Sequence, residues 1–336
     1  MIKMSIIIPI LNEEKYIAKC LDSIMESDFD KSEMEVLLVD GGSEDKTIEI
    51  IKGYQKRYPF LKLLHNPKKI VPVAMNIGIK EAKGEYIIRL DAHSSYSKDY
   101  FSKLIFWHKK LNADNVGAVW ITDVLNKTKT SIAIKNVLSD KFGVGGAKFR
   151  IGTEKIEKVD TVPFGCYKKE VFDKIGLYDE RLVRNQDIEL NKRLKKAGGK
   201  IYLVPEIKCT YYARETFKDL AKNNFNNGLW NILTAYYTGV LSSLSFRHFV
   251  PMLFVLSLIF FGICGIFNKW CLYVFLGILF SYLSIILVRS WQIKKNTTFF
   301  HQILAFLVLH FSYGIGSIVG IIKVLKEKLN RRKQWR

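Results

Sequence analysis

Two residues at the end of one apolar run have the side chains of a metal site. The run that begins at Gly84 leads to Asp91 and His93, and residues two apart in an extended chain point to the same side. A carboxylate and an imidazole that converge there suit a divalent cation such as Mn²⁺ or Mg²⁺. Such a cation would act as a Lewis acid and neutralise a diphosphate leaving group. The alternative is a helix-capping Asp91 beside an incidental His93.

Asp187 is a second candidate for chemistry. Leu190 and Leu194 follow it at helical spacing, and Gly198 marks the end of that helix. A carboxylate in this place can take the proton of an acceptor hydroxyl, which contributes about 10²–10⁴ to a rate. A bare Asp at a helix start is more often a cap, so Asp187 alone does not decide.

The first apolar run, which ends at Pro9, is also followed by polar residues that a ligand could use. Asn12 can cap the next helix, and Glu13 can lie near its positive end. The same backbone N–H groups could hold part of a nucleotide. A plain helix start explains these residues equally well.

After the second apolar run, Asp40 lies where a base or ribose could donate hydrogen bonds to it. Gly41 and Gly42 allow a tight turn and the close approach of a ligand. Ser43 or Asp45 would cap the following helix. Turns of this composition are common, so an ordinary turn is the alternative.

An alternation of strands and helices must position these side chains. The sequence predicts strands at residues 4–9, 35–40, 61–65, 86–91 and 116–122. It predicts helices at residues 13–25, 45–57, 71–83 and 98–110. The alternation implies βαβ units and a mostly parallel sheet, whose ligands lie beyond the carboxyl ends of the strands.

Composition bounds the class of protein. The 336 residues are 49% apolar and 25% charged, which excludes a mainly disordered chain and suggests about two domains. The net charge of +20 requires an anionic neighbour: nucleic acid, a phosphate-bearing substrate or an acidic membrane. Five scattered cysteines without a CxxC pair disfavour a zinc knuckle and indicate a reducing compartment. The first apolar run is too short for the core of a signal peptide.

The C-terminal third has the composition of a membrane region. Residues 249–267, 271–288 and 299–322 lack charges and are long enough to be membrane helices, although buried core helices are an alternative. Residues 216–247 mix aromatic, basic and amide side chains. This mixture fits an amphipathic connector in the membrane interface and an ordinary surface helix equally well.

The charges around these apolar runs conflict with three simple spans. The tail, residues 326–336, is basic, and the positive-inside rule places it in the cytoplasm together with Lys294 and Lys295. Three spans would separate the tail from a cytoplasmic N-terminal domain. Either residues 216–244 hide another inserted segment, or residues 299–322 form a re-entrant hairpin or a tilted interfacial helix. The glycines that would permit a bend there are Gly314, Gly316 and Gly320.

Four motifs in this order resemble those of the family 2 inverting glycosyltransferases of the GT-A fold. They are Ile-Pro-x-Leu-Asn-Glu from residue 8, Val-Asp-Gly-Gly-Ser-x-Asp-x-Thr from residue 39, Leu-Asp-Ala-His from residue 90 and Asn-Gln-Asp-x-Glu-Leu-x-x-Arg-Leu from residue 185. The resemblance covers roughly residues 4–215 and implies an α/β GT-A catalytic domain with a Rossmann-like central sheet. Residues 142–150, 163–165 and 176–180 look like those of membrane-bound transferases of succinoglycan-type exopolysaccharide assembly.

The resemblance implies a role for each matching position. The residues expected to bind the nucleotide sugar are Pro9, Asn12, Glu13, Asp40, Gly41, Ser43, Arg89 and Asp91. Asp91 and His93 stand where the family holds its divalent cation, Mn²⁺ or Mg²⁺, and Asp187 stands at the catalytic base. The residues expected to contact the acceptor or the diphosphate are Arg150, Arg184 and Gln186. Residues 142–150 look like a flexible lid, with a plain surface loop as the alternative.

Two positions depart from the pattern of the family. His93 replaces the second metal-binding Asp, which leaves the identity of the metal open, and Gln186 replaces the acid that precedes the base. The Gln-x-x-Arg-Trp motif of the family's processive synthases does not follow Asp187. We therefore expect one sugar to be added per encounter.

The sequence thus predicts an inverting, metal-dependent glycosyltransferase of exopolysaccharide or cell-surface glycan biosynthesis. Its expected partners are a nucleotide-sugar donor, a lipid-linked saccharide acceptor, membrane lipids and polysaccharide-assembly proteins, but no nucleic acid, because the basic residues are dispersed. Its expected place is the inner, cytoplasmic membrane, as a multi-pass protein (membrane region 248–325) with a cytoplasmic catalytic domain, 1–215. Two other functions remain as alternatives: a non-catalytic membrane scaffold and a sugar-nucleotide nucleotidyltransferase. A nucleotidyltransferase would have a glycine- and lysine-rich nucleotide loop near the N-terminus, and residues 9–15 do not have that composition.

Overall fold

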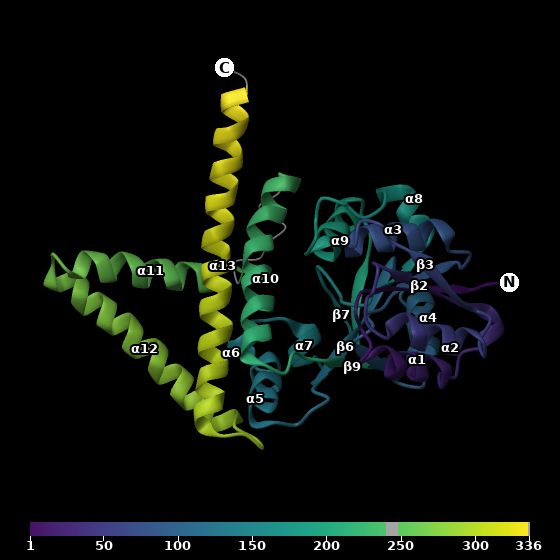
Figure 1. Ribbon diagram of the computed structural model, residues 1–336, viewed down its shortest axis with the longest axis horizontal. Coiled ribbons are helices and arrows are strands. Elements are labelled where there is room, and N and C mark those ends of the chain that lie inside the picture. Colours follow the sequence, from purple (N-terminus) through teal and green to yellow (C-terminus); the bar gives the residue numbers. More distant parts are fainter. Residues whose placement is uncertain (240–247, 335–336) are drawn as a thin grey trace. The chain divides into compact units, whose positions relative to one another are not determined.

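The chain folds as two compact units (Figure 1). This computed structural model describes residues 1–239 and 248–334, so the end of the predicted connector and the last two residues of the predicted tail lie outside the described residues. The first unit joins Met1–Ile121 to Lys148–Tyr212, and the second joins Thr122–Ala147 to the helices after Ala213. Residues 122–147, which the sequence placed in the catalytic domain, thus pack with the C-terminal helices.

The first unit is built on one mixed sheet, which confirms the α/β class. Its strands are β1 (Met4–Ile10), β2 (Met34–Asp40), β3 (Leu61–His65), β4 (Tyr86–Arg89), β5 (Ser94–Tyr96), β6 (Asn115–Asp123), β7 (Glu157–Lys158), β8 (Cys166–Lys168) and β9 (Ile201–Tyr212). Their order is β3-β2-β1-β4-β8-β6-β9-β5, with β7 beside β9. The run from β3 to β4 is parallel, as predicted, whereas β8 pairs antiparallel with β4 and β6, and β5 and β7 pair antiparallel with β9.

Helices of the first unit connect these strands. They are α1 (Ile17–Met25), the 3₁₀ turn η1 (Lys31–Glu33), α2 (Thr47–Gln55), α3 (Val71–Glu81), α4 (Tyr100–Lys110), α7 (Lys148–Ile151), α8 (Glu170–Ile175) and α9 (Gln186–Lys196). Helix α1 starts later than the predicted residue 13, because the backbone N–H groups of Glu13 and Glu14 donate to the side chains of Thr47, at the start of α2, and Asp45, just before it. Strand β4 ends at Arg89, two residues before the predicted end.

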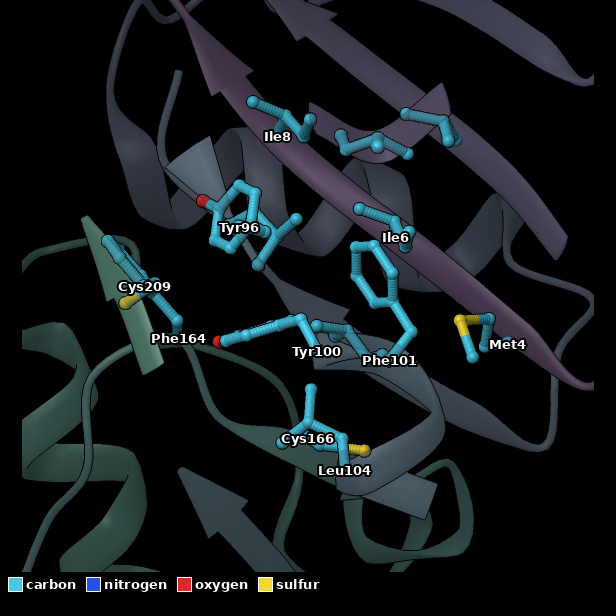
Figure 2. Close-up of a cluster of buried hydrophobic side chains, with 14 of the residues drawn as sticks. Met4, Ile6, Ile8, Tyr96, Tyr100, Phe101, Leu104, Phe164, Cys166 and Cys209 are labelled. Carbon is cyan, nitrogen blue, oxygen red and sulfur yellow. The ribbon is translucent and has the colours of Figure 1, made fainter. Parts of the chain in front are cut away.

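The core of the first unit lies on both faces of the sheet. Strand β1 is buried on both sides, so its successive side chains enter different clusters: Ile6 and Ile8 join one, and Ile7 joins the other with Leu37. Figure 2 shows the first cluster, in which Tyr96, Tyr100 and Phe101 lie beside the strand. A central strand buried on both faces holds its carboxyl end in a fixed position, which is where the candidate site begins.

His108 is a buried imidazole in this core, and it makes stability depend on pH. Its ring lies edge-on to Tyr86 at 5.0 Å, and neither ring nitrogen has a hydrogen-bond partner among the described residues. Burial lowers the pKa of His108 to about 4 from the ordinary 6.5. The unfolded chain therefore binds this proton first, so the stabilisation is complete above the ordinary pKa and is lost as the pH falls toward the lowered one.

We expect the free energy of unfolding to fall by roughly 3 kcal/mol from this residue between pH 7 and pH 4. Unfolding measured in detergent at a series of pH values tests this, with His108→Phe as the comparison. The variant keeps an aromatic ring without a titrating group, so its curve should be flatter between pH 6.5 and 4. Parallel curves for the two proteins would contradict the assignment.

The second unit is helical in its described part. Its helices are α5 (Lys129–Leu138), α6 (Lys141–Val144), α10 (Phe217–Thr238), α11 (Val250–Gly265), α12 (Lys269–Ile293) and α13 (Phe299–Gln334). By length and composition α12 and α13 could cross a membrane, whereas α11 is shorter. The predicted lid, residues 142–150, is helical only at its two ends, in α6 and α7, and Phe142 of α6 packs on Phe306 and His310 of α13.

The predicted bend at the glycines of the last apolar run is wrong, because α13 is one continuous helix. A Cβ added to Gly316 would lie 2.0 Å from the carbonyl oxygen of Phe225, and one added to Gly228 would lie 2.1 Å from that of Tyr313. The glycines therefore let α10 and α13 approach backbone to backbone, as small residues do between membrane helices.

Candidate active site

The loops that follow β1 and β2 are joined by hydrogen bonds. The backbone N–H of Asn12 donates to Ser43 Oγ at 2.9 Å, and Asn12 Oδ1 accepts from the N–H of Glu44 at 2.8 Å. Asn12 has a φ of 55° and does not cap α1, which corrects that part of the prediction. The two loops thus form one rigid edge at the carboxyl ends of neighbouring parallel strands, and Pro9 lies just before it in β1.

Asp40 shapes the second of these loops. Its carboxylate accepts from the N–H of Gly42 at 2.8 Å, from the N–H of Ser43 at 3.1 Å and from the hydroxyl of Ser43 at 2.6 Å. Gly42 has a φ of 84°, which favours glycine. The N–H of Gly41 donates to the carbonyl of Ile10 at 2.9 Å. The predicted ligand-binding carboxylate is therefore also the group that holds its own turn.

Asp91 and His93 come together in a turn after β4. Asp91 Oδ2 lies 4.0 Å from His93 Nε2, so the two side chains converge as the sequence predicts. The other ring nitrogen, Nδ1, lies 3.3 Å from Glu13 Oε1, which fixes the orientation of the imidazole. Glu13, predicted to line the nucleotide pocket, thus lies against His93. No group of three or more Cys, His, Asp or Glu side chains is placed to hold a metal within residues 1–239 and 248–334.

Arg89 joins this cluster to the candidate base. Its Nη2 donates to Asp91 Oδ1 at 3.0 Å, and its Nη1 pairs with Asp187 Oδ2. The side chain of Arg89 is only 11% exposed. Burial acts to lower the pKa of Arg89, but the neighbouring Asp91 carboxylate raises it overall, so the guanidinium stays charged. Arg89 was predicted as a nucleotide-sugar ligand; its position between two carboxylates 96 residues apart in sequence was not predictable from spacing.

Asp187 lies in the first turn of α9, as predicted. Asn185 before the helix has a left-handed φ of 62°, and Gln186 is buried at the start of α9. Because Arg89 holds Oδ2 of Asp187, its Oδ1 is left without a hydrogen-bond partner among the described residues. Arg184 lies just before α9 and is partly exposed.

A buried amide network, which the sequence analysis missed, fixes α9 to the sheet. Asn191 Oδ1 accepts from Asn115 Nδ2 at 2.8 Å and from the hydroxyl of Tyr167 at 2.9 Å, and its Nδ2 donates to Thr161 Oγ1 at 2.9 Å. Asn191 is completely buried and lies one helical turn after Asp187. The one sequence signal for this network is that Asn191, a polar residue, occupies a position on the apolar side of the helix.

Asn191→Leu should lower the free energy of unfolding by about 2–4 kcal/mol, because it strands buried donors on Asn115 and Tyr167. Unfolding in detergent measures the loss. Lys196→Leu, on the exposed end of the same helix, is the matched control and should change stability by less than about 0.5 kcal/mol. Equal losses in the two variants would show that the network does not anchor α9.

An aromatic wall extends from His93 to Arg150. The rings of Trp120 and Tyr211 stack at 4.4 Å, and Tyr211 meets His93 edge-on at 5.4 Å. The Arg150 guanidinium lies 4.5 Å from the ring of Trp120 and 5.1 Å from that of Tyr211. Neither ring was predicted from the sequence, because only the adjacency of β6 and β9 in the sheet brings them together.

Arg150 has a positive charge that the described residues do not neutralise. Its Nη1 is buried without a hydrogen-bond partner in the described part of the chain, and burial lowers the pKa of Arg150. A guanidinium that rests on aromatic rings keeps its donor edges for an anion. Among the residues predicted to contact the diphosphate or the acceptor, Arg150 therefore has the geometry that best suits an anion.

Comparison with known proteins shows the family to which the chain belongs. The family model described as "Glycosyl transferase family 2" matches residues 5–176. A Methanococcus voltae protein named dolichyl N-acetyl-alpha-D-glucosaminyl phosphate 3-beta-D-2,3-diacetamido-2,3-dideoxy-beta-D-glucuronosyltransferase is 33% identical over 230 residues, 67% of this chain and 71% of that protein. The succinoglycan biosynthesis protein ExoA of Rhizobium meliloti is 32% identical over 225 residues, 66% of this chain and 67% of that protein.

Among solved structures, the mannosyltransferase PcManGT from Pyrobaculum calidifontis, in complex with GDP-Man and Mn²⁺, superposes with a TM-score of 0.57 at 15% identity. The superposition covers 93% of this chain and 87% of that one, and it shows a shared GT-A fold. The family match, residues 5–176, includes Arg89, Asp91 and His93. The chain therefore belongs to glycosyl transferase family 2 and is a glycosyltransferase.

Proposed function

We propose that this enzyme moves one sugar, with inversion, from a nucleotide-sugar donor to a lipid-linked or glycan acceptor in exopolysaccharide or cell-surface glycan biosynthesis. The observation that carries the proposal is the pair of carboxylates, Asp91 and Asp187, held on two sides of the buried Arg89 guanidinium. An inverting displacement needs charge compensation at the leaving group and a base at the attacking hydroxyl. The cluster offers Asp91 as a ligand for a cation that would compensate the leaving group, and Asp187 as the base.

The chemistry of Asp91 and His93 fits a divalent cation. Two ligand atoms bound at about 2.1 Å each lie at most about 4.2 Å apart, and Asp91 Oδ2 and His93 Nε2 are 4.0 Å apart. Glu13 accepts from Nδ1 of His93, so Nε2 stays free as a ligand. A bound Mn²⁺ or Mg²⁺ would neutralise the diphosphate, whose oxygens and water would complete the coordination. The Mn²⁺ in the archaeal mannosyltransferase complex supports this proposal.

The residues of the chain itself would then bind the nucleotide sugar, orient the acceptor and deprotonate its hydroxyl. The joined loops at Asn12, Asp40, Gly41 and Ser43 would receive the nucleoside beyond the ends of β1 and β2. Arg150, with Arg184, would bind the diphosphate or the acceptor. Asp187 Oδ1 would take the proton of the acceptor hydroxyl while Arg89 holds Oδ2. The oxygen attacks the anomeric carbon from the face opposite the nucleotide, so no covalent sugar–enzyme intermediate forms.

Three observations support a lipid-linked acceptor at the cytoplasmic face of the inner membrane. The Methanococcus relative is named for a dolichyl-phosphate-linked sugar, and the Rhizobium relative for the synthesis of a polysaccharide. Helices α12 and α13 are apolar enough to meet a membrane. The exposed lysines at the end of α13 suit anionic lipid.

The test is sugar transfer by the full-length protein in detergent. It is given a panel of nucleotide sugars, Mn²⁺ or Mg²⁺, and either a membrane lipid extract or soluble sugars. We expect nucleotide release coupled to a labelled lipid product, both lost on chelation. No release from any donor by folded protein would count against transferase activity. Equal rates on soluble sugars would exclude the lipid-linked acceptor.

A further inference from the structure

The hairpin of α11 and α12 has the apolar surface that the second unit leaves uncovered. Figure 1 shows the two helices meeting at a tip that lies away from α13, while α10 runs beside α13. Only 11% of the most apolar stretch of α12 is buried within the structure, against 39% of that of α13. The large apolar side chains exposed near the tip include Phe260, Ile263, Ile266, Phe267, Trp270 and Tyr273.

Helix α13 is covered instead by protein along much of its length. It runs parallel to α10: Phe217 stacks with His301 near their starts, and Tyr237 donates to Glu327 at 3.0 Å near their ends. Pro251 of α11 crosses at Gly314, where an added Cβ would lie 2.5 Å from the Pro251 carbonyl oxygen. Packing within the unit therefore accounts for part of the apolar run of α13, and the rest of the run stays partly or fully exposed.

The polarity of α10 argues against a membrane-crossing α13. Because the two helices pack side by side, α10 would have to enter the hydrocarbon with α13. The central part of α10 has five asparagines, which are Asn223, Asn224, Asn226, Asn227 and Asn231. Polar side chains within a bilayer are costly, so the pair is better placed at the membrane surface.

The α11–α12 hairpin has the dimensions and end residues of a membrane insert. Trp270 and Trp291, near the two ends of α12, are separated by about 31 Å of helix, close to the thickness of the hydrocarbon layer. Lys294 lies 3.3 Å from the ring centre of Trp291, as basic and aromatic residues do at an interface. The turn needs no water, because the N–H groups of Ile266 and Asn268 donate to carbonyls of α11.

The base of the hairpin is fastened to the segment that joins the first unit. Asn136 of α5 donates to the carbonyl of Ile293 at 3.0 Å, and Thr297 donates to the carbonyl of Lys129. Asp140 pairs with Arg289 of α12. Residues 122–147 continue directly into the first unit at both ends. With the hairpin in a bilayer, this chain connection would keep the α12–α13 turn and the catalytic unit on one side of the membrane.

We propose that the α11–α12 hairpin alone enters the bilayer, and that the α10–α13 pair lies in the interface on the catalytic side. The exposed lysines of α13, Lys323, Lys326 and Lys328, then face the same anionic surface as Lys294. This arrangement puts the basic tail on the same side of the membrane as the catalytic unit. It removes the conflict between three apolar runs and the positive-inside rule.

Cysteine labelling in membrane vesicles tests the arrangement. Cys264 and Cys271 are first changed to alanine, while the buried Cys20, Cys166 and Cys209 stay. Single cysteines are then placed at the tail (Lys328→Cys), at the tip (Asn268→Cys) and on the exposed surface of α4 (Lys109→Cys) as the marker of the catalytic side. A membrane-impermeant maleimide is added to inside-out and right-side-out vesicles.

We expect Lys328→Cys and Lys109→Cys to react from the same face, and Asn268→Cys not to react from that face. Labelling after detergent shows that each cysteine is reactive in folded protein. Reaction of Lys328→Cys from the face opposite Lys109→Cys would show that α13 crosses the membrane. Reaction of Asn268→Cys from the face of Lys109→Cys would show that the hairpin is not inserted. Either result overturns the proposal, and neither depends on sugar transfer.

Discussion

Asp187→Asn is expected to lower kcat by about 10²–10⁴-fold, the range that a positioned general base supplies. Asparagine has the shape of aspartate but cannot take a proton. Arg89 keeps its contact with Asp91, so the donor side of the site should persist and the KM for the nucleotide sugar should change little. Initial rates of nucleotide release over a range of donor concentrations measure both quantities.

Glu189→Gln is the matched control for this substitution. Glu189 lies on the same helix, has the same charge and pairs with Arg193, away from Arg89. It should leave kcat within a few-fold of the parent while costing some stability. If Asp187→Asn retained the parental rate, Asp187 would not be the base, and another group would have to deprotonate the acceptor hydroxyl.

The sequence was sufficient to predict those parts of the site that depend on residues close together in the chain. Asp91 and His93 are two residues apart, so their convergence follows from chain geometry, although a turn rather than an extended strand produces it. Asp187 was placed at the start of a helix by the leucine spacing that follows it. The parallel half of the sheet followed from the alternation of apolar runs with amphipathic ones.

Contacts between segments that lie far apart in the chain could not be predicted from the sequence. Arg89 meets Asp187 because β4 and α9 come together in the fold, and no local pattern records that. The amide network at Asn191 depends on β6 and β8 in the same way. The glycines of α13 have two opposite interpretations in sequence, a bend or a close contact, and only the partner α10 decides between them.

Arg89→Met is expected to lower kcat/KM by about 10²-fold or more, because it removes the group that sets the distance between Asp91 and Asp187. Methionine fills much of the same volume without a charge. It leaves two carboxylates facing each other without their shared cation, so the free energy of unfolding should also fall by about 3–5 kcal/mol. Rates at several Mn²⁺ concentrations, together with unfolding in detergent, separate the two effects.

The decisive comparison combines this variant with the base. If Arg89 acts through Asp187, the double variant Arg89→Met with Asp187→Asn should be little slower than the worse single variant, because groups that act as a unit are not additive. Arg57→Met is the control for charge and size, since Arg57 is exposed and lies over Tyr54 on α2. Additive losses in the double variant would show that Arg89 serves only the donor side. Arg89 would then be a ligand of the nucleotide sugar, as the sequence analysis first predicted.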